Sequence, residues 1–458
     1  MPSVQATHGE ATIAAIITGA GGAVAVIRIS GPDAIRIAAG IWQGRRSLAQ
    51  PPWRELRLGA CRDGETLLDP SVLAVFMPAP HSYTGEDVVE IHCHGGSVAA
   101  SLVLNALLRH GCQPASAGEF TKRAFINGRM DLTQAEAVGD LILARSESAL
   151  RLAGRQLDGL LGRRVNALYD LLVDRLAEIE SRLDFPDEHL DFPDAGRVDA
   201  DFAQAEAEVA QLLSSRREGE ILRHGILVAI AGPPNVGKSS LMNLLLGRDR
   251  AIVTHIPGTT RDLIEDTLQI RGIPIRLTDT AGIRTTGDFI EQDGIRRSRN
   301  ILQDARLILW VYEAGTPVAE TFAELAGLAA PIILVANKAD LLEGEPPAVP
   351  AAVAHLPRVL IAARSGQGLE NLLDAIGKAV WHSETHDEPE IAVNARHAAG
   401  LELAANSLAD ARDRCATGEW ELAAIGLRTA ITEIGRITGR TADADLLDTI
   451  FARFCIGK

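Results

Sequence analysis

The sequence predicts a multi-domain protein of α/β and α type, in which an α/β domain is inserted into a helical domain and an α+β domain precedes both. A chain of 458 residues is too long for one hydrophobic core, since a single domain holds roughly 150 residues. The apolar pattern is helical at residues 128–220 and again at 384–458, with an α/β pattern at 221–383 between them. Insertion explains this order economically, and three consecutive domains are the alternative.

Residues 1–127 are expected to form the α+β domain. Apolar runs at 24–29, 72–76 and 88–91 alternate with Gly/Pro turns, as strands do, and a helix is expected to begin near Ser97. The segment His92-Cys93-His94 contains residue types that bind metals. Alternate residues of a strand point to opposite faces, so only the two histidines would share a side, and we expect no metal there.

Long helices are expected from Asp131 onward. The acidic insert at 184–194 contains Pro186 and Pro193, which break the first long helix, and helical sequence then resumes through about Arg217. Two more helices are expected at 392–416 and 422–437. The apolar residues that step by three and four along one face, and so predict a bundle core, are Val165, Leu168, Leu172, Leu176, Ile179 and Leu183.

Between the helical parts, four short apolar runs alternate with helical sequence and predict a parallel sheet. They are residues 226–231, 275–278, 307–312 and 332–336.

Composition excludes some functions. A net charge of −15 and a pI of 5.3 argue against a general polyanion binder, because such proteins present broad basic faces. A nucleic acid partner would have to meet a local patch or a second protein. The sequence has no apolar run long enough for a membrane span and no basic, apolar leader, so a cytoplasmic protein is expected. Five scattered cysteines predict neither a disulfide framework nor a zinc site.

The segment Gly232-Pro-Pro-Asn-Val-Gly-Lys-Ser239 matches the phosphate-loop pattern and lies between an expected strand and an expected helix. Its glycines let backbone N–H groups approach phosphates. Lys238 supplies positive charge at the β- and γ-phosphates, and the Ser239 hydroxyl can bind Mg²⁺. The sequence therefore predicts a nucleoside triphosphate site here.

Three further segments specify a GTPase. Asp279-Thr-Ala-Gly282 follows a strand and faces the metal and the γ-phosphate, and Thr260 is placed to close over Mg²⁺. Asn337-Lys-Ala-Asp340 supplies a carboxylate that accepts hydrogen bonds from guanine but finds no matching donors on adenine. Ile283 stands where Ras-type proteins have a glutamine that orients water. From position alone, Glu291 is equally well a catalytic carboxylate or a solvated surface group.

An arginine finger is also missing from these motifs. Candidates are Arg284 and the cluster Arg296, Arg297 and Arg299, although surface solvation or RNA contact suits them equally.

Several long motifs resemble one family over the whole chain. They are Ser82-Tyr-Thr-Gly-Glu-Asp-Val-Val-Glu-Ile-His-Cys-His-Gly-Gly96, the segment Gly118 to Val138, Ala251-Ile-Val-Thr-His-Ile-Pro-Gly-Thr-Thr-Arg-Asp262 and the terminal Cys455-Ile-Gly-Lys458. On these residues the sequence resembles the MnmE (TrmE) family of tRNA-modifying GTPases. A ribosome-assembly GTPase and a folate enzyme with an appended switch are the other candidates. The former would be expected to carry a basic RNA-binding module, and the latter leaves the GTPase motifs unexplained.

The resemblance implies a Ras-like P-loop GTPase domain inserted into a helical domain, preceded by an α+β tetrahydrofolate-binding-like domain that also forms a homodimer. It implies that the protein acts with the FAD protein MnmG. Together they would add an aminomethyl or carboxymethylaminomethyl group at C5 of wobble uridine 34 of certain tRNAs. The one-carbon unit would come from 5,10-methylene-tetrahydrofolate, with 5-formyl-tetrahydrofolate as a bound form. K⁺ would replace the arginine finger, and dimerisation of the GTPase domains would activate hydrolysis.

The resemblance also assigns residues. Glu291 matches the catalytic glutamate, Mg²⁺ is assigned to Ser239 and Thr260, and Cys455 is either a reactive thiol or a small residue of a terminal loop. The K⁺ ligands would be Asn235, Thr254, Ile256 and Thr259, and the folate would be held by Arg28, Glu90, Arg129 and Lys458. The full set expected at GTP is Asn235, Val236, Gly237, Lys238, Ser239, Ser240, Thr254, His255, Ile256, Pro257, Gly258, Thr259, Thr260, Asp279, Thr280, Ala281, Gly282, Asn337, Lys338, Ala339 and Asp340.

Three positions depart from the family pattern. The turn Gly19-Ala-Gly-Gly22 lacks an arginine, and Arg129 replaces a common lysine, so folate affinity could differ. The fifth GTPase motif reads Ala362-Ala-Arg364 instead of Ser-Ala, which could lower guanine affinity.

Overall fold

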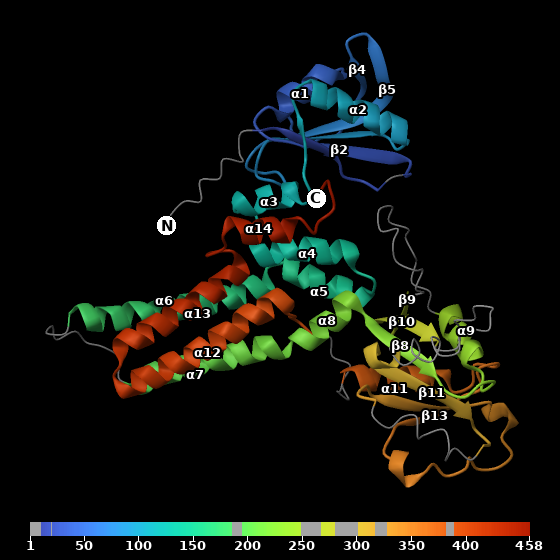
Figure 1. Ribbon diagram of the computed structural model, residues 1–458. Helices are drawn as coiled ribbons and strands as arrows, with labels where there is room; N and C mark the ends of the chain where they lie inside the picture. The colour runs from blue at the N-terminus through green and yellow to red at the C-terminus, as the bar shows by residue number, and fades with distance from the viewer. Residues whose placement is uncertain are drawn as a thin grey trace, which may run out of the picture.

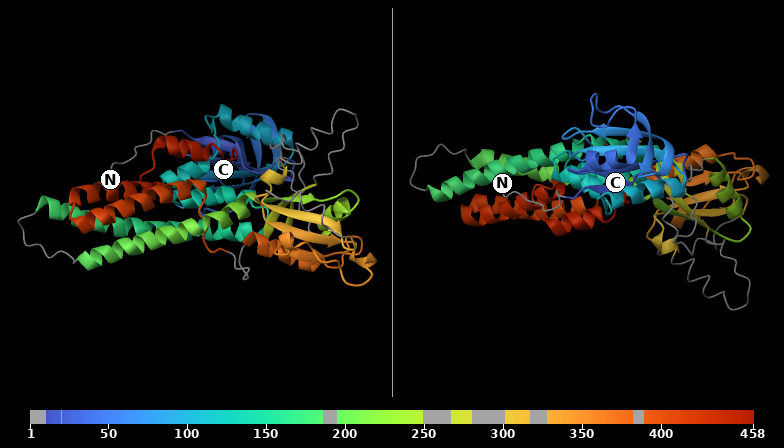
Figure 2. Two further views of the ribbon diagram at one scale, coloured as in Figure 1. Left: turned by 60° about the horizontal axis from the view of Figure 1, so that its bottom comes forward. Right: turned by 90° about the horizontal axis from the view of Figure 1, so that it is seen from above.

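The computed structural model describes residues 11–19, 21–185, 195–248, 267–279, 301–316, 328–381 and 389–458. An N-terminal α+β domain and an α/β domain flank an elongated helical domain (Figures 1 and 2). No helix in these ranges is both long and apolar enough to cross a bilayer.

A seven-stranded sheet in the order β3-β4-β5-β6-β2-β1-β7 forms the N-terminal domain. Its pairs are antiparallel except β1 with β7. The strands are β1 (Ile13–Ile16), β2 (Val24–Ser30), β3 (Trp42–Gly44), β4 (Arg57–Asp63), β5 (Thr66–Met77), β6 (Val88–His94) and β7 (Gln113–Pro114). Helices α1 (Ala34–Ile41) and α2 (Ser97–Arg109) share an apolar core with one face of this sheet. The helix expected near Ser97 is confirmed.

The opposite side of this domain meets the rest of the chain. Helix α3 (Glu119–Ile126) packs against α14 (Ala444–Phe451), the last helix of the protein (Figure 1). The N-terminal domain therefore contacts the C-terminal end of the sequence.

The helical domain is assembled from both sides of the inserted segment. Its other helices are α4 (Leu132–Leu143), α5 (Glu147–Leu157), α6 (Leu160–Asp184), α7 (Ala195–Ser214), α8 (Arg216–His224), α12 (Ala395–Thr417) and α13 (Trp420–Thr438). Helix α6 packs against α13, and α7 packs against α12, around one apolar core (Figure 2). The expected stripe lies in this core, with Leu176 and Leu183 half-buried at its edge. The insertion is confirmed, since neither half could bury its stripe alone.

Local sequence explains where two of these helices begin. Asp131 caps α4 in a capping box with Gln134, and Asn394 caps α12 in another with His397. The expectation that helix ends near Arg217 is wrong, because α8 continues to His224. Its apolar residues Ile221 and Leu222 are buried, which holds the extra turns in place.

The inserted domain has a six-stranded sheet in the order β13-β12-β11-β8-β10-β9. The strands are β8 (Ile226–Ala231), β9 (Thr267–Ile270), β10 (Ile273–Asp279), β11 (Leu307–Glu313), β12 (Ile332–Asn337) and β13 (Arg358–Leu360), with helices α9 (Lys238–Arg248) and α11 (Leu369–Trp381). The sheet is parallel as expected, except that β9 is antiparallel to β10. Arg271 and Gly272 join those strands in a tight turn, both with positive φ (48° and 81°), so the chain reverses directly.

Polar side chains tie both connections of the inserted domain to the helical domain. Arg223 of α8 donates to Asp140 of α4 at 2.6 Å and to the Ala392 carbonyl at 3.0 Å. Gln156 of α5 donates to the same Ala392 carbonyl at 2.5 Å. Helix α8, which leads into the inserted domain, and the segment at Ala392, which returns from it, are therefore held together.

Beside this contact lies a buried ion pair. Arg396 donates to both carboxylate oxygens of Glu136, at 2.9 and 2.7 Å. The Nε2 of His397 lies 2.7 Å from Glu136 Oε2, while its Nδ1 accepts the backbone N–H of Asn394 at 3.3 Å. These two bonds assign a neutral imidazole with its proton on Nε2.

Candidate nucleotide and ligand sites

The phosphate loop joins the central strand β8 to helix α9, as the motif predicts. Gly232 and Gly237 have φ of 137° and 95°. A Cβ on Gly232 would lie 2.0 Å from the Val311 carbonyl oxygen, and one on Gly237 would lie 2.3 Å from Asn337 Nδ2. Both positions thus require glycine because of conformation and space together.

Lys238, at the start of α9, is buried and bends back over the loop. Its Nζ donates to the carbonyls of Gly232 and Pro233 at 2.9 and 2.7 Å. Ser239 and Ser240 follow in the first turn with exposed side chains, and Asn235 is exposed with φ of 64°. An ammonium and hydroxyls are therefore gathered around the N-terminus of α9, which favours an anion.

Asn337 links the phosphate loop to the loop after β13. Its amide Nδ2 donates to the Val236 carbonyl at 2.8 Å, and its Oδ1 accepts the N–H of Ala363 at 3.0 Å. The side chain is buried, with 2% exposed. Both polar ends of Asn337 thus hold protein backbone and set the distance between the two loops.

The next residues present the base-recognition motif. Lys338 has φ of 60°, and its Nζ lies 2.9 Å from Glu313 Oε2. The short 3₁₀ helix η2 (Ala339–Leu341) places Asp340 on the surface. An exposed carboxylate three residues after the buried Asn337 suits recognition of the donor edge of guanine.

The segment Asp279 to Gly282, which was expected to face the metal, begins at the same edge of the sheet. Asp279 ends β10 opposite Ile230 of β8, one strand away from the phosphate loop. Its side chain lies outside the described part of the protein. So do the other expected switch residues, which are Thr254, His255, Ile256, Pro257, Gly258, Thr259, Thr260, Thr280, Ala281, Gly282 and Glu291.

A second polar site lies on the N-terminal sheet. Arg28 of β2 and Glu90 of β6 are directly opposite in register, and Arg28 Nε donates to Glu90 Oε1 at 2.8 Å. The guanidinium carbon lies 4.8 Å from the centre of the Tyr83 ring and 5.5 Å from that of Phe120. Aromatic faces stabilise this cation and hold the pair in place.

The chain's last residues close this site. The carbonyl of Lys458 accepts the N–H of Phe120 at 3.1 Å, and Gly457 sits so close to β1 that a Cβ would lie 2.6 Å from the Ile16 carbonyl oxygen. Arg129 packs against the connection between β5 and β6, which carries Tyr83, because a Cβ on Gly85 would lie 3.3 Å from the Arg129 Cγ. The four residues expected at folate therefore belong to elements in mutual contact.

Comparison with known proteins gives matches along the whole chain. Residues 12–129 match the family model of the GTP-binding protein TrmE N-terminus, and residues 132–455 match that of the MnmE helical domain. A tRNA modification GTPase MnmE from Nitratidesulfovibrio vulgaris is 44% identical, covering 98% of this chain and 99% of the relative. Another, from Carboxydothermus hydrogenoformans, is 43% identical over 98% and 100%.

The chain belongs to the MnmE family of tRNA modification GTPases. It is accordingly a GTP hydrolase that takes part in tRNA modification. Among solved structures, the G domain of the T. maritima FeoB iron transporter is 26% identical and covers 34% of this chain and 98% of that one, with a TM-score of 0.25.

Sequence reasoning missed several contacts of this MnmE protein. Tyr83 and Phe120 flank Arg28, and the Ala363 backbone holds Asn337. Tyr83 lies within a motif that carried the family resemblance, so its place there was the available signal. Phe120 lies within another of these motifs, and Ala363 lies within the fifth GTPase motif, so the same signal was available for both.

The thiols of this MnmE protein differ in accessibility. All five cysteines are free, and burial raises the pKa of Cys61 and Cys112 to about 12 and that of Cys93 and Cys415 to about 11. Cys455, in the C-terminal tail, is exposed. Accessibility therefore distinguishes Cys455 from the three buried thiols.

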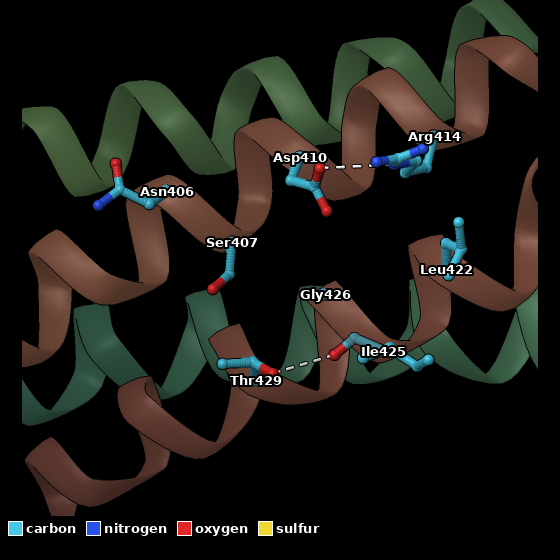
Figure 3. A pocket seen from close by; sticks show the side chains of 8 residues that line it. All are labelled: Asn406, Ser407, Asp410, Arg414, Leu422, Ile425, Gly426 and Thr429. Carbon is cyan, nitrogen blue, oxygen red and sulfur yellow. Dashed lines mark hydrogen bonds and ion pairs between the residues drawn. The ribbon is translucent and has the colours of Figure 1, made fainter.

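A groove of about 370 Å³ also opens between α12 and α13 of the helical domain (Figure 3). Its floor is Gly426, where a Cβ would lie 3.1 Å from the Ser407 carbonyl oxygen. Leu422 and Ile425 line it, and Asp410 pairs with Arg414 at 3.5 Å. None of the residues assigned from the sequence lies in this groove.

Proposed function

We propose that this MnmE protein is a K⁺-dependent GTPase that, with the FAD protein MnmG, modifies C5 of wobble uridine 34 of certain tRNAs. The added aminomethyl or carboxymethylaminomethyl group takes its one-carbon unit from a tetrahydrofolate. The observation that carries the proposal is the presence of two separate sites in one chain. One is the phosphate loop with its buried Lys238, and the other is the Arg28–Glu90 pair closed by the C-terminal tail.

The residues at the phosphate loop suit two cations. Oxygen ligands are what Mg²⁺ prefers, and the exposed hydroxyl-bearing side chain of Ser239 at the start of α9 supports Mg²⁺ binding there, with Thr260 as its second ligand. The left-handed backbone at Asn235 leaves its amide side chain exposed beside the loop, which supports its role as a K⁺ ligand. Thr254, Ile256 and Thr259 complete the K⁺ site. Bound K⁺ supplies positive charge at the phosphates, as an arginine finger would.

Hydrolysis is assigned to Glu291, which polarises the attacking water when the two GTPase domains of a dimer pair. A carboxylate is needed because Ile283 cannot hydrogen-bond to water. Asp340 selects GTP through its exposed carboxylate. Asn337 contributes by holding the two loops, since both ends of its amide are engaged with backbone.

Folate binds at Arg28, Glu90, Arg129 and Lys458, as 5-formyl- or 5,10-methylene-tetrahydrofolate. The pterin ring has a row of N–H donors that suits the Glu90 carboxylate, and the glutamate tail of folate suits the basic residues. The fixed orientation of Arg28 between two aromatic rings supports this site, because a preorganised pair loses little entropy on binding.

The N-terminal domain also forms the homodimer. Its β4–β5 hairpin exposes apolar residues, with Leu58 67% and Leu67 46% exposed, and Leu58 is paired directly with Leu73, which is 39% exposed. Such a patch favours a protein interface. Replacing Leu58 by Glu is expected to convert a dimer to a monomer in sedimentation velocity, whereas Leu422→Glu in the helical groove is the matched control. A Leu58→Glu dimer as tight as wild type would refute this interface.

We assign the domains to residues 1–127, 128–220, 221–383 and 384–458, with α8 (Arg216–His224) running across the second boundary, and the protein acts in the cytoplasm. The net charge of −15 supports a role for MnmG in recruiting tRNA, because an acidic chain repels the phosphate backbone.

The pathway is tested by nucleoside mass spectrometry of tRNA from a strain that lacks its own family member. Complementation with this chain is expected to restore the modified uridine, and Arg28→Ala is expected not to. Modified uridine at wild-type level in the Arg28→Ala strain would remove the folate site from the reaction.

A further inference from the structure

His92 lies beside the proposed folate residues on β6. Side chains of a strand alternate between faces, so His92 shares the face of Glu90, whereas Ile91 and Cys93 point into the apolar core. Its register partners are Val26 on β2 and Leu73 on β5. The imidazole is therefore the next side chain along the sheet from Glu90 on that face.

The Nε2 atom of His92 is buried and has no hydrogen-bond partner among the residues that the structure describes. It lies 3.7 Å from Glu90 Oε2, which is too long for a hydrogen bond. A buried nitrogen without a partner is costly, so such atoms usually mark a place that another group completes.

The other oxygen of Glu90 is already engaged. Glu90 Oε1 accepts from Arg28, whose guanidinium carbon lies 4.8 Å from the centre of the Tyr83 ring and 5.5 Å from that of Phe120. The acceptor Glu90 Oε2 and the nitrogen His92 Nε2 therefore lie side by side. With its proton on Nε2, a neutral His92 imidazole would present a donor next to the acceptor Glu90 Oε2.

That pair matches one edge of a 4-oxo pterin, which presents its N3–H donor next to its C4 carbonyl acceptor. We propose that His92 is a further ligand-binding residue of the N-terminal site and donates from Nε2 to the C4 carbonyl oxygen, while Glu90 accepts from the neighbouring N–H groups. This inference rests on the proposed folate function. It gives His92 a role in selectivity, because a 4-amino pterin places a donor where the 4-oxo ring has an acceptor.

Substitutions that keep or remove this donor separate binding from a structural role. A glutamine amide can place its nitrogen near the position of Nε2, whereas an asparagine amide reaches only the position of Nδ1. We expect His92→Gln to keep affinity for 5-formyl-tetrahydrofolate within about threefold, and His92→Asn and His92→Phe to lose about tenfold or more. The affinity of a 4-amino analogue, aminopterin, is expected to change less than about threefold in all three variants.

The experiment is isothermal titration of the full-length chain with 5-formyl-tetrahydrofolate and with aminopterin. If wild type binds neither, the proposed folate function fails before His92 is tested. If wild type binds but His92→Asn binds equally well, the inference about His92 is overturned while the folate site stands. Equal losses for both ligands would also overturn it, since they would indicate a structural role. If His92→Phe does not fold, the comparison of His92→Gln with His92→Asn decides.

Discussion

Replacing Glu136 by glutamine tests the buried ion pair at the connection between the inserted and helical domains. Glutamine has nearly the same shape, so no cavity forms. Arg396 and His397 both donate to the carboxylate, at 2.7–2.9 Å. One end of the amide would therefore turn a donor toward a donor, and the Arg396 charge would lose its partner.

The expected loss follows from burial. The Glu136 side chain is 14% exposed and that of Arg396 is 22% exposed, so solvent screens the pair little. Breaking one partner of a buried pair costs about 3–5 kcal/mol, because the other charge stays buried. For a domain of roughly 150–250 residues, such as the helical domain, about 1 kcal/mol shifts the unfolding midpoint by roughly 2–4 °C. The midpoint of the helical domain is therefore expected to decrease by about 10 °C.

Scanning calorimetry of the full-length chain at a fixed scan rate measures this decrease. GDP is expected to shift the transition of the inserted domain, which distinguishes it from that of the helical domain. Glu180→Gln is the matched control, because Glu180 pairs with Arg428 at 2.7 Å but the two side chains are 37% and 61% exposed. That control is expected to cost about 1 kcal/mol or less. A decrease for Glu136→Gln no larger than that for Glu180→Gln would show that the Glu136 ion pair contributes no more than an exposed one.

Three further predictions follow from the same structure. Burial lowers the pKa of His397, so the folded protein favours the neutral ring. The free energy of unfolding should therefore decrease as pH falls below the unfolded pKa near 6.5, by up to about 1.4 kcal/mol per pH unit. Midpoints measured between pH 7 and pH 5 should fall for wild type and fall less for His397→Gln, and parallel curves would contradict this. Asn337→Ala removes both bonds between the loops and should weaken GDP binding by about tenfold or more in fluorescence titration with a labelled nucleotide. Asn406→Ala is the control and should leave GDP binding unchanged, because Asn406 lines the groove of the helical domain. Gly232→Ala should abolish nucleotide binding because of its Cβ clash with Val311, and a nucleotide-binding variant would show that the loop can move aside.

Local patterns predicted much of the fold. The phosphate loop, the strand beginning at Ile226 and the helix beginning at Ser97 each depend on short-range sequence, and the structure places them as expected. The stripe on α6 predicted a buried face, but its partners α7 and α13 could not be read from periodicity, which does not specify what covers a face.

The remaining features depend on contacts between distant segments. The antiparallel β9 arises from the turn at Arg271-Gly272, whose positive φ at a non-glycine residue was not evident in the sequence. The pairing of Arg28 with Glu90 joins residues on separate strands, and only the family resemblance brought them together beforehand. Glu136, Arg396 and His397 come from both sides of the insertion, so no local pattern could connect them.

We propose that GTP hydrolysis by this protein uses K⁺ and Glu291. The most direct test of this proposal is steady-state GTP hydrolysis in K⁺ and in Na⁺ buffers of equal ionic strength, for wild type and for Glu291→Ala. We expect strong activation of wild type by K⁺ and not by Na⁺, and loss of hydrolysis with retained GTP binding in the variant. Equal wild-type rates in the two salts, or full activity of Glu291→Ala, would contradict it.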